Sequence, residues 1–365
     1  MNALSFYGRC LLFSFGVLMA QVESDELKDL RSKAESGDTE AQMKLGTMYY
    51  FGRGVAKDPV EALKWCRKAA ELGVPLAQYR MGVRYSTGEG VPKDPTEAVK
   101  WYRKAAEQKY VSAEFAMGSA YYAGNGVPRD AAQAVSWFLA AAEHGNVIAQ
   151  FNLGKCYEAG NGVAQDMAEA IKWYRKASEN GYAQAQYTLG SLSDVGKGLP
   201  QSYTEAFQWY RKAAEQGLPA AQMAMGKAYI IGKGVTKDYA EGLKWYRKVA
   251  IQGANGNTVV EGLPLVQYIL GFAYLDGQGV EKDRVEAYAW FTLSAFNGYS
   301  DAKGQLKVLE QKLPPEMIRV GQQRARELQL GKDLPETKQL QREAEQKFQK
   351  TEAEAKEKKK RDAGA

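Results

Sequence analysis

The stretch KDPTEAVKWYRKAAE, residues 93–107, combines acids, bases, a tryptophan and a tyrosine in a pattern that would suit a catalytic or binding motif. Variants of it recur every 36 residues, with a last step of 45, and each contains one of the chain's seven tryptophans: Trp65, Trp101, Trp137, Trp173, Trp209, Trp245 and Trp290. A period in this range is typical of proteins built from stacked structural repeats. We therefore interpret these residues first as structural.

One unit, GDTEAQMKLGTMYYFGRGVAKDPVEALKWCRKAAEL (37–72), predicts two helices. Leu45 and Met48 lie on one face of a first helix, and Trp65 and Ala69 lie on one face of a second, at the spacing of amphipathic helices. Each unit is therefore predicted to be a helical hairpin.

The residues expected at the helix ends support the hairpin. Asp58, Pro59 and Glu61 form the pattern of an N-cap, a first-turn proline and an N3 acid. The other units keep the cap and the N3 residue: Asp94/Glu97, Asp130/Gln133, Asp166/Glu169, Ser202/Glu205, Asp238/Glu241 and Asp283/Glu286. Paired carboxylates also serve acid–base catalysis, but capping accounts for this spacing.

Gly52 and Gly54 follow a helix rather than a strand, which predicts a helix end and not a phosphate-binding loop.

A glycine follows the Leu or Met of each first helix, as Gly46 follows Leu45. A side chain there would keep the neighbouring helix away, and we expect the tryptophan of the second helix to fill the gap.

Composition favours an ordinary folded protein, with 45% hydrophobic and 25% charged residues. The net charge of +6 is mild for a nucleic-acid-binding protein. Arg-Lys pairs recur, but an acid such as Glu107 lies four residues after Arg103, where helical geometry allows the two charges to pair. We therefore predict no nucleic-acid partner.

Residues 1–20 have the pattern of a secretory signal peptide, in which Arg9 precedes an apolar run that ends at Ala20. That run is too short to cross a bilayer as a lone helix. We expect an exported chain, periplasmic or in the cell envelope, with no membrane span after signal cleavage. Retention of the signal as an anchor stays open.

Catalysis has few candidate residues. His144 is the only histidine, which excludes histidine-based triads and multi-histidine metal sites. Ser300-x-x-Lys303 matches a motif of penicillin-binding enzymes, but its partner motifs are missing. Cys66 and Cys156 lie three units apart, too far for a disulfide, and are predicted to be buried free thiols. No catalytic, metal-binding or cofactor-binding residue is predicted.

The pattern A-x-x-x-L-G-x-x-Y-x-x-G-x-G-V-x-x-D-x-x-x-A-x-x-W-Y-x-x-A-A-x-x-G resembles the Sel1-like repeat, a relative of the tetratricopeptide repeat. The resemblance covers residues 37–298 in seven units and implies an all-α fold, a right-handed α/α solenoid that acts as a docking surface. Residues 21–36 are then expected to form an N-terminal capping helix, and 299–331 a partial repeat and a C-terminal capping helix. Residues 332–365 are expected to be a charged, flexible or helical tail that nothing anchors.

The resemblance also implies functions. Family members in bacterial envelopes and secretions bind proteins, and some are immunity proteins against secreted toxins. A cysteine-rich branch is linked to β-lactam binding or hydrolysis, but this chain lacks its cysteine pairs. The leading hypothesis is an exported scaffold that binds a partner protein, such as an envelope component. The alternatives are a periplasmic immunity protein that neutralises a secreted toxin, and a hydrolase of β-lactams or cell-wall peptides.

Tetratricopeptide analogues line their concave face with the first helix of each hairpin, so its variable positions are the predicted partner-binding residues. They are Tyr50, Tyr122, Lys155, Glu158, Asp194, Lys227, Ile230, Phe272 and Leu275. A row is the set of residues at one equivalent position in successive repeats. The row through Met43 is always large and apolar, which indicates either packing between units or an exposed recognition stripe. Ser193, Gly242 and the insertion at 254–262 depart from the repeat, either where a partner docks or by drift.

Overall fold

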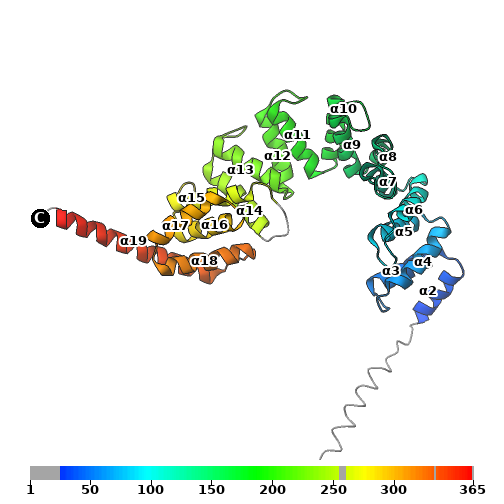
Figure 1. Cartoon of the computed structure of the whole chain (residues 1–365), viewed down its shortest axis with the longest axis horizontal. Helices are drawn as coiled ribbons and strands as arrows, with labels where there is room; N and C mark the ends of the chain where they lie inside the picture. The colour runs from blue at the N-terminus through cyan, green and yellow to red at the C-terminus, as the bar shows by residue number, and fades with distance from the viewer. Residues whose placement is uncertain (1–24, 255–259, 333, 364–365) are drawn as a thin grey trace, which may run out of the picture. The chain divides into compact units, whose positions relative to one another are not determined.

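The computed structural model describes residues 25–254, 260–332 and 334–363. These residues form helices and no strand, which confirms the predicted all-α class (Figure 1). The predicted signal peptide and residues 255–259 of the insertion lie outside the described residues. In the described ranges, no helix combines the length and apolar character needed to cross a membrane.

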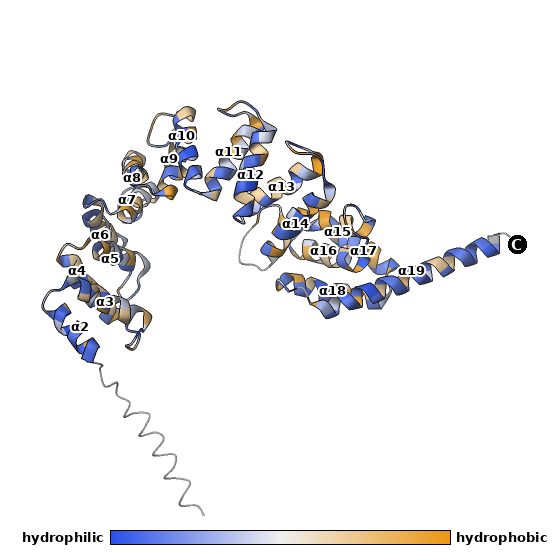
Figure 2. Cartoon of the chain, turned by 180° about the vertical axis from the view of Figure 1, so that it is seen from behind, coloured by the Kyte–Doolittle hydropathy of each residue, from blue (hydrophilic) through white to orange (hydrophobic). Residues whose placement is uncertain are grey.

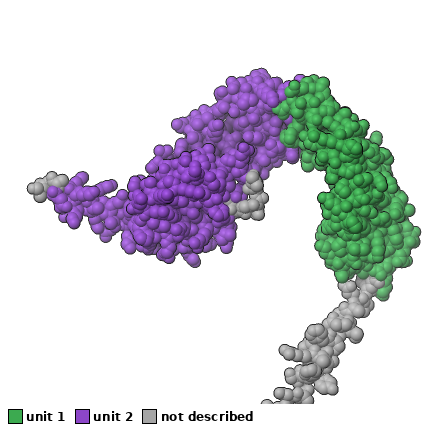
Figure 3. Space-filling model, in the orientation of Figure 1, with its two compact units in different colours: residues 1–166 green, residues 167–365 purple. Residues whose placement is uncertain are grey.

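The chain divides into two compact units, Met1–Asp166 and Met167–Ala365 (Figure 3). The first contains α2 (Asp25–Glu35), α3 (Thr39–Phe51), α4 (Pro59–Glu71), α5 (Pro75–Thr87), α6 (Pro95–Glu107), α7 (Val111–Ala123), α8 (Ala131–Glu143) and α9 (Val147–Ala159). The second contains α10 (Met167–Glu179), α11 (Ala183–Val195), α12 (Tyr203–Glu215), α13 (Pro219–Ile231), α14 (Tyr239–Ala254), α15 (Leu263–Asp276), α16 (Arg284–Phe296), α17 (Ser300–Lys312), α18 (Pro315–Gln329) and α19 (Pro335–Ala363).

Local sequence signals begin and end these helices as predicted. Oδ1 of Asp58 accepts hydrogen bonds from the backbone N–H groups of Val60 and Glu61, at 2.9 and 3.0 Å. At the end of α3, Gly52 has φ of 70° and its N–H donates to the carbonyl of Met48. The cap satisfies donors that a helix start leaves unpaired, and the left-handed glycine reverses the chain. Capping is therefore the role of the aspartate.

Within each unit, consecutive helices pack as hairpins, and the second helix of one hairpin packs on the first helix of the next. The indole of Trp65 shares a cluster with Ala34 and Leu45, and Trp101 shares one with Leu63 and Met81. These two indoles therefore lie between their own hairpin and the element that precedes it. Five of the seven tryptophans are buried, and Trp137 and Trp209 are half-buried. The predicted α/α solenoid is confirmed.

The prediction that tryptophan fills the space beside the helical glycine is wrong, because the following residue does so. A Cβ built on Gly82 would lie 2.4 Å from the ring of Tyr102, and one on Gly118 would lie 2.5 Å from the ring of Phe138. Tyr210, Tyr246 and Phe291 occupy the same place in later repeats. The glycine therefore gives room to the ring that follows the tryptophan.

The predicted pairing of an arginine with the acid four residues later is found at Arg211 and Glu215, 3.9 Å apart, but Arg103 contacts the next repeat instead. Nη2 of Arg103 donates to the hydroxyl of Tyr121 at 2.8 Å, and Arg67 donates in the same way to Tyr85 at 2.7 Å. The arginine therefore ties one hairpin to the next.

Helix α19 corrects the expectation of an unanchored tail. It is hydrophilic over most of its length (Figure 2), yet it packs on α18 and α16. Thr337, Gln341 and Glu345 are buried on the docked side. Hydrophobic patterning could not predict this docking because polar contacts provide most of it.

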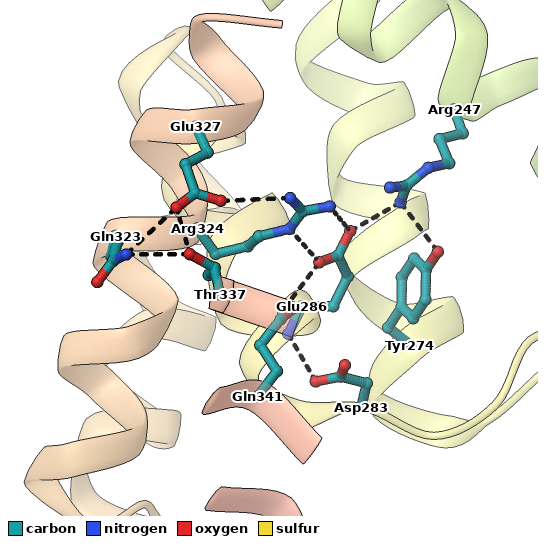
Figure 4. A network of polar contacts seen from close by, with 9 residues as sticks. All are labelled: Arg247, Tyr274, Asp283, Glu286, Gln323, Arg324, Glu327, Thr337 and Gln341. Atoms are coloured by element: carbon teal, nitrogen blue, oxygen red, sulfur yellow. Dashed lines mark hydrogen bonds and ion pairs between the residues drawn. The ribbon is translucent and has the colours of Figure 1, made fainter. Parts of the chain in front are cut away.

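One of those contacts reaches Glu286 of α16, which lies at the centre of a polar network (Figure 4). Its carboxylate accepts hydrogen bonds from Nε of Arg324 at 2.7 Å, from Nη1 of Arg247 at 2.7 Å and from Nε2 of Gln341 at 3.0 Å. Burial opposes its ionisation, but the two guanidinium groups outweigh that effect and lower the pKa of Glu286. The network thus joins α14, α16, α18 and α19.

Candidate partner-binding face

The first helices of the hairpins bear the predicted partner-binding residues, and the structure brings some of them together. In the first unit, Tyr122 of α7 and Lys155 of α9 line one cavity of about 140 Å³, together with Phe138 and Asn161. Tyr122 is 44% exposed, and Lys155 is exposed. An aromatic ring and an exposed ammonium group thus share one hollow. Glu158, on the same helix as Lys155, is half-buried.

In the second unit, Asp194 of α11 and Lys227 of α13 line a cavity of about 350 Å³. Its walls are largely aromatic and aliphatic, with Tyr203, Phe207 and Leu265 among them. Asp194 forms an ion pair of 2.8 Å with Lys233, whose ammonium group lies 4.4 Å from the ring centroid of Tyr203.

Tyr210 also lines this cavity. Its pKa is raised by burial, and the nearby Asp194 carboxylate adds to the effect. Its hydroxyl therefore stays protonated at neutral pH, and Lys227 is the exposed charge in this hollow.

Three other predicted residues pack against core residues. Phe272 lies edge-on to Phe291, with ring centroids 5.2 Å apart, and Leu275 packs against the same core cluster. Ile230 occupies the space beside Gly242, where a Cβ would lie 2.7 Å from its Cγ1. The departure at Gly242 thus has a packing explanation, because an alanine there would collide with Ile230.

The row through Met43 packs against the neighbouring second helix. Its rings approach the ring that follows each tryptophan: Tyr79 lies 5.8 Å from Tyr102 and Tyr187 lies 5.5 Å from Tyr210, between centroids. These positions are half-buried. The row therefore packs inside the protein, but these ring contacts lie within one hairpin, where packing between units was expected.

His144, the single histidine, has a structural contact. Its Nδ1 lies 2.8 Å from Oε2 of Glu114, which is 2% exposed. Other repeats place an amide pair at this point, as where Gln108 donates to Gln78 at 2.8 Å. The pair of His144 and Glu114 therefore takes the place of an amide pair that closes other hairpins.

The remaining chemical candidates are also accounted for by local contacts. Ser300 is the first residue of α17, and its hydroxyl donates to Asp301 at 3.2 Å. Both Cys66 and Cys156 are buried free thiols, as predicted. Over the described residues, no group of three or more histidine, cysteine or acidic side chains is placed to hold a metal ion.

Sequence reasoning missed a third cavity, of about 300 Å³, which Tyr50 lines together with Cys66, Arg80, Arg84 and Glu89. The guanidinium carbon of Arg84 lies 4.3 Å from the ring centroid of Tyr50, and the hydroxyl of Tyr50 lies 3.2 Å from Glu89. Burial raises the pKa of the Cys66 thiol, although Arg84 and Arg80 act in the opposite direction. Two departures from the repeat, at Cys66 and Arg84, were the available signal.

Ser193, in the row of tyrosines that begins with Tyr49, is fully buried. Within the described part of the chain, its hydroxyl has no hydrogen-bond partner. The tyrosine that is absent here would receive an arginine from the preceding hairpin, as Tyr85 does.

Comparisons with known proteins agree with this architecture. The Sel1 repeat family matches residues 39–74, 75–110, 111–146, 147–182, 183–218, 219–253 and 264–299. Among solved structures, the chain is similar to a Sel1 repeat protein from Oxalobacter formigenes, with 34% identity and a TM-score of 0.66 over 81% of this chain and 85% of that one.

Two further solved structures are less similar. A protective antigen of uropathogenic Escherichia coli with an SLR fold has 29% identity and a TM-score of 0.32, over 88% of each chain. An immunity protein from Pseudomonas aeruginosa has 21% identity and a TM-score of 0.40, over 60% of this chain and 85% of that one. TM-scores at this level carry no functional comparison. No curated protein matches the chain. With seven matched repeats over most of its length, the chain belongs to the Sel1 repeat family.

Proposed function

We propose that this protein is an exported scaffold that binds a partner protein through the face formed by the first helices of its hairpins. Sel1 repeats support a protein-interaction role in general. The observation that carries the proposal is the location of the hollows. Each is lined by first-helix positions that differ between repeats, such as Lys155 in one unit and Lys227 in the other.

The chemistry of the hollows suits a protein partner. Each places aromatic or aliphatic walls beside an exposed ammonium group, as Tyr122 lies beside Lys155. Aromatic side chains dominate the energetic centres of protein interfaces, and exposed charges provide specificity and association rate. A protein segment with apolar and acidic side chains would fit both hollows.

Export is part of this proposal and rests on the signal-like residues 1–20. It places the partner in the envelope or among secreted toxins. N-terminal sequencing of the mature protein from a fractionated cell tests it, with Gln21 as the expected first residue. A mature chain that starts at Met1 in the cytoplasmic fraction would contradict export.

The test of the binding face uses Lys155→Glu and Lys227→Glu, because both side chains are exposed. Crosslinking and pull-down should recover the partner at least tenfold less well with each variant, since two negative charges then face each other. A tenfold loss corresponds to about 1.4 kcal/mol. The melting temperature should stay unchanged.

Matched controls are Lys64→Glu and Lys172→Glu on the second helices, where the side chains are 64% and 68% exposed. They remove surface ion pairs of small energetic value. Equal loss of the partner with all four variants, or with none, would remove the proposed face.

The two alternatives predict different outcomes. An immunity protein should restore growth to cells that produce a cognate toxin, and Lys155→Glu or Lys227→Glu should cancel that protection. A hydrolase should turn over β-lactams in a reaction that Ser300→Ala abolishes. The contact of Ser300 with Asp301, in place of a lysine, supports binding over hydrolysis.

A further inference from the structure

The cavity in the first unit, between α3, α4 and α5, differs from everything else in the solenoid. It has a volume of about 300 Å³, which is at the small end of ligand-binding pockets. Its lining includes Gly46 and Tyr50 of α3, Cys66 of α4, and Arg80 and Arg84 of α5. Two substitutions within the repeat pattern create it.

The first substitution removes a ring. The residue after the tryptophan is aromatic in the other six repeats: Tyr102, Phe138, Tyr174, Tyr210, Tyr246 and Phe291. In the first repeat it is Cys66. The three atoms nearest to a Cβ on Gly46 are two backbone atoms and the Cβ of Trp65, at 3.3 Å or more, whereas a Cβ on Gly82 would lie 2.4 Å from a ring. The cavity is the space that this ring would fill.

The second substitution introduces a buried cation. The row of Arg84 is otherwise small or apolar: Met48, Ala120, Cys156, Leu192, Ala228 and Ala273. Arg84 is only 8% exposed. Within the described residues, its Nη1 has no hydrogen-bond partner, and the nearest carboxylate oxygen, on Glu89, is 3.8 Å away. A buried guanidinium without a full set of acceptors is costly, which favours an acceptor supplied from outside.

Charge around the cavity favours an anion. The charged residues that line the cavity are Arg80, Arg84 and Glu89, so the lining has a net charge of one positive unit. Nη1 of Arg80 donates to the hydroxyl of Thr47 at 3.1 Å, so this guanidinium is held in place at the wall. Tyr50, Tyr79 and Phe51 provide aromatic walls for an apolar group.

We propose that this cavity binds an aromatic carboxylate, with the ring in the place that an aromatic side chain fills in the other repeats and the carboxylate on Arg84. The shared chemistry of a carboxyl-terminal Phe or Tyr residue and of a free aromatic acid fits this description. The site deepens the proposed function, because Tyr50 belongs to the same face. It rests on that function only for the source of the acid.

Isothermal titration calorimetry with the full mature chain tests the site without any partner. The probes are N-acetyl-phenylalanine and its uncharged amide. The acid should bind at least tenfold more tightly than the amide, since a charge-assisted hydrogen bond forms only with the acid. Equal affinity for both probes, or no binding of the acid, would overturn the proposal.

Two variants separate the two features of the site. Arg84→Met installs the residue that the preceding repeat has at Met48, and it should abolish the preference for the acid. Cys66→Tyr installs the ring of the other repeats and should abolish binding of both probes while the melting temperature stays equal or rises. Retained preference in the first variant, or retained binding in the second, would contradict the site.

A matched control moves the cavity by one repeat. The double variant Cys66→Tyr/Tyr102→Cys closes the natural space and opens the equivalent one beside Gly82, where Ala120 stands in the row of Arg84. Any binding there should be equal for the acid and the amide. A preference for the acid in this variant would show that Arg84 is not its cause and would overturn the proposal.

The source of the acid is decided by a second pair of probes, an octapeptide that ends in phenylalanine with a free or an amidated carboxyl group. Tighter binding of the free peptide than of N-acetyl-phenylalanine supports a polypeptide terminus, and equal or weaker binding supports a free aromatic acid. Partner capture tested at Lys155 and Lys227 does not involve this cavity, so failure of one experiment leaves the other interpretable.

Discussion

The ring of Tyr102 lies directly against the helical Gly82, so that a Cβ at position 82 would come within 2.4 Å of Cδ1 and Cε1 of the ring. This contact allows α5 and α6 to approach closely inside one hairpin, and it recurs in later repeats. The first hairpin lacks it because Cys66 stands in place of the ring. The two glycines therefore make a natural pair for mutagenesis.

Gly82→Ala is expected to destabilise the protein more than Gly46→Ala. Alanine favours a helix over glycine by about 0.5–1 kcal/mol, but overpacking against a ring costs about 1–3 kcal/mol. At Gly46 the nearest atoms lie at 3.3 Å or beyond, so the higher helix propensity of alanine offsets most of the crowding. Chemical denaturation of both variants checks this, and equal losses would contradict the ring-on-glycine packing.

Trp101→Ala should destabilise the first unit by about 3–5 kcal/mol, because it empties a packed site between repeats. The indole is 6% exposed and contacts the cluster that contains Leu63 and Met81. Repeats contact only their neighbours, so hydrogen exchange should accelerate mainly in α4, α5 and α6. Trp209→Ala, at a half-buried site, is the control and should cost less. Uniform acceleration over the unit would contradict nearest-neighbour stacking.

Glu286→Gln should destabilise the second unit far more than Glu241→Gln, although both residues hold the N3 position of their helices. Glu286 is 4% exposed and balances Arg324 and Arg247. Removal of its charge leaves the buried Arg324 and the half-buried Arg247 without their shared carboxylate, which costs about 3–5 kcal/mol. Glu241 pairs with the exposed Lys244, and such pairs contribute about 0–1 kcal/mol. Similar melting temperatures for the two variants would show that the network is not stabilising.

Asp283 should make the stability of the second unit depend on pH. Burial raises its pKa to about 6, and the carboxylates of Glu286 and Glu345 add to the effect. Because the folded pKa exceeds the unfolded value of 3.8, the folded state binds the proton more tightly. The stability that protonation provides is present below about pH 4 and is lost as the pH rises through 6.

Asp283→Asn removes this titration and keeps a good N-cap residue. The melting temperature of the variant relative to the unmodified protein should therefore increase between pH 4.5 and pH 7. The corresponding change in the free energy of unfolding is at most about 3 kcal/mol, since one pKa unit corresponds to about 1.4 kcal/mol. The pKa of Glu286 is lowered from its usual value of 4.5, so its titration lies outside this pH range. Parallel melting curves at all pH values would argue against a raised pKa.

The sequence by itself determined the helical hairpins and their boundaries. A cap such as Asp58 bonds to amides two and three residues away, and a helix face repeats every three to four residues, so both signals are local. The period of the tryptophans then required the hairpins to stack. Nothing beyond neighbouring residues was needed for these conclusions.

The tertiary structure decided which residues meet. Trp101 and Tyr102 are about 100° apart around their helix, and only the packing of α6 on α5 shows that the tyrosine faces Gly82. Polar contacts anchor α19, and their partners on α16 are distant in the chain, so its composition gave no sign of docking. Cys66 and Arg84 were visible as departures from the repeat, but they line one cavity only because α4 stacks on α5. A side-chain contact between stacked helices depends on their relative rotation and approach, which no local pattern encodes.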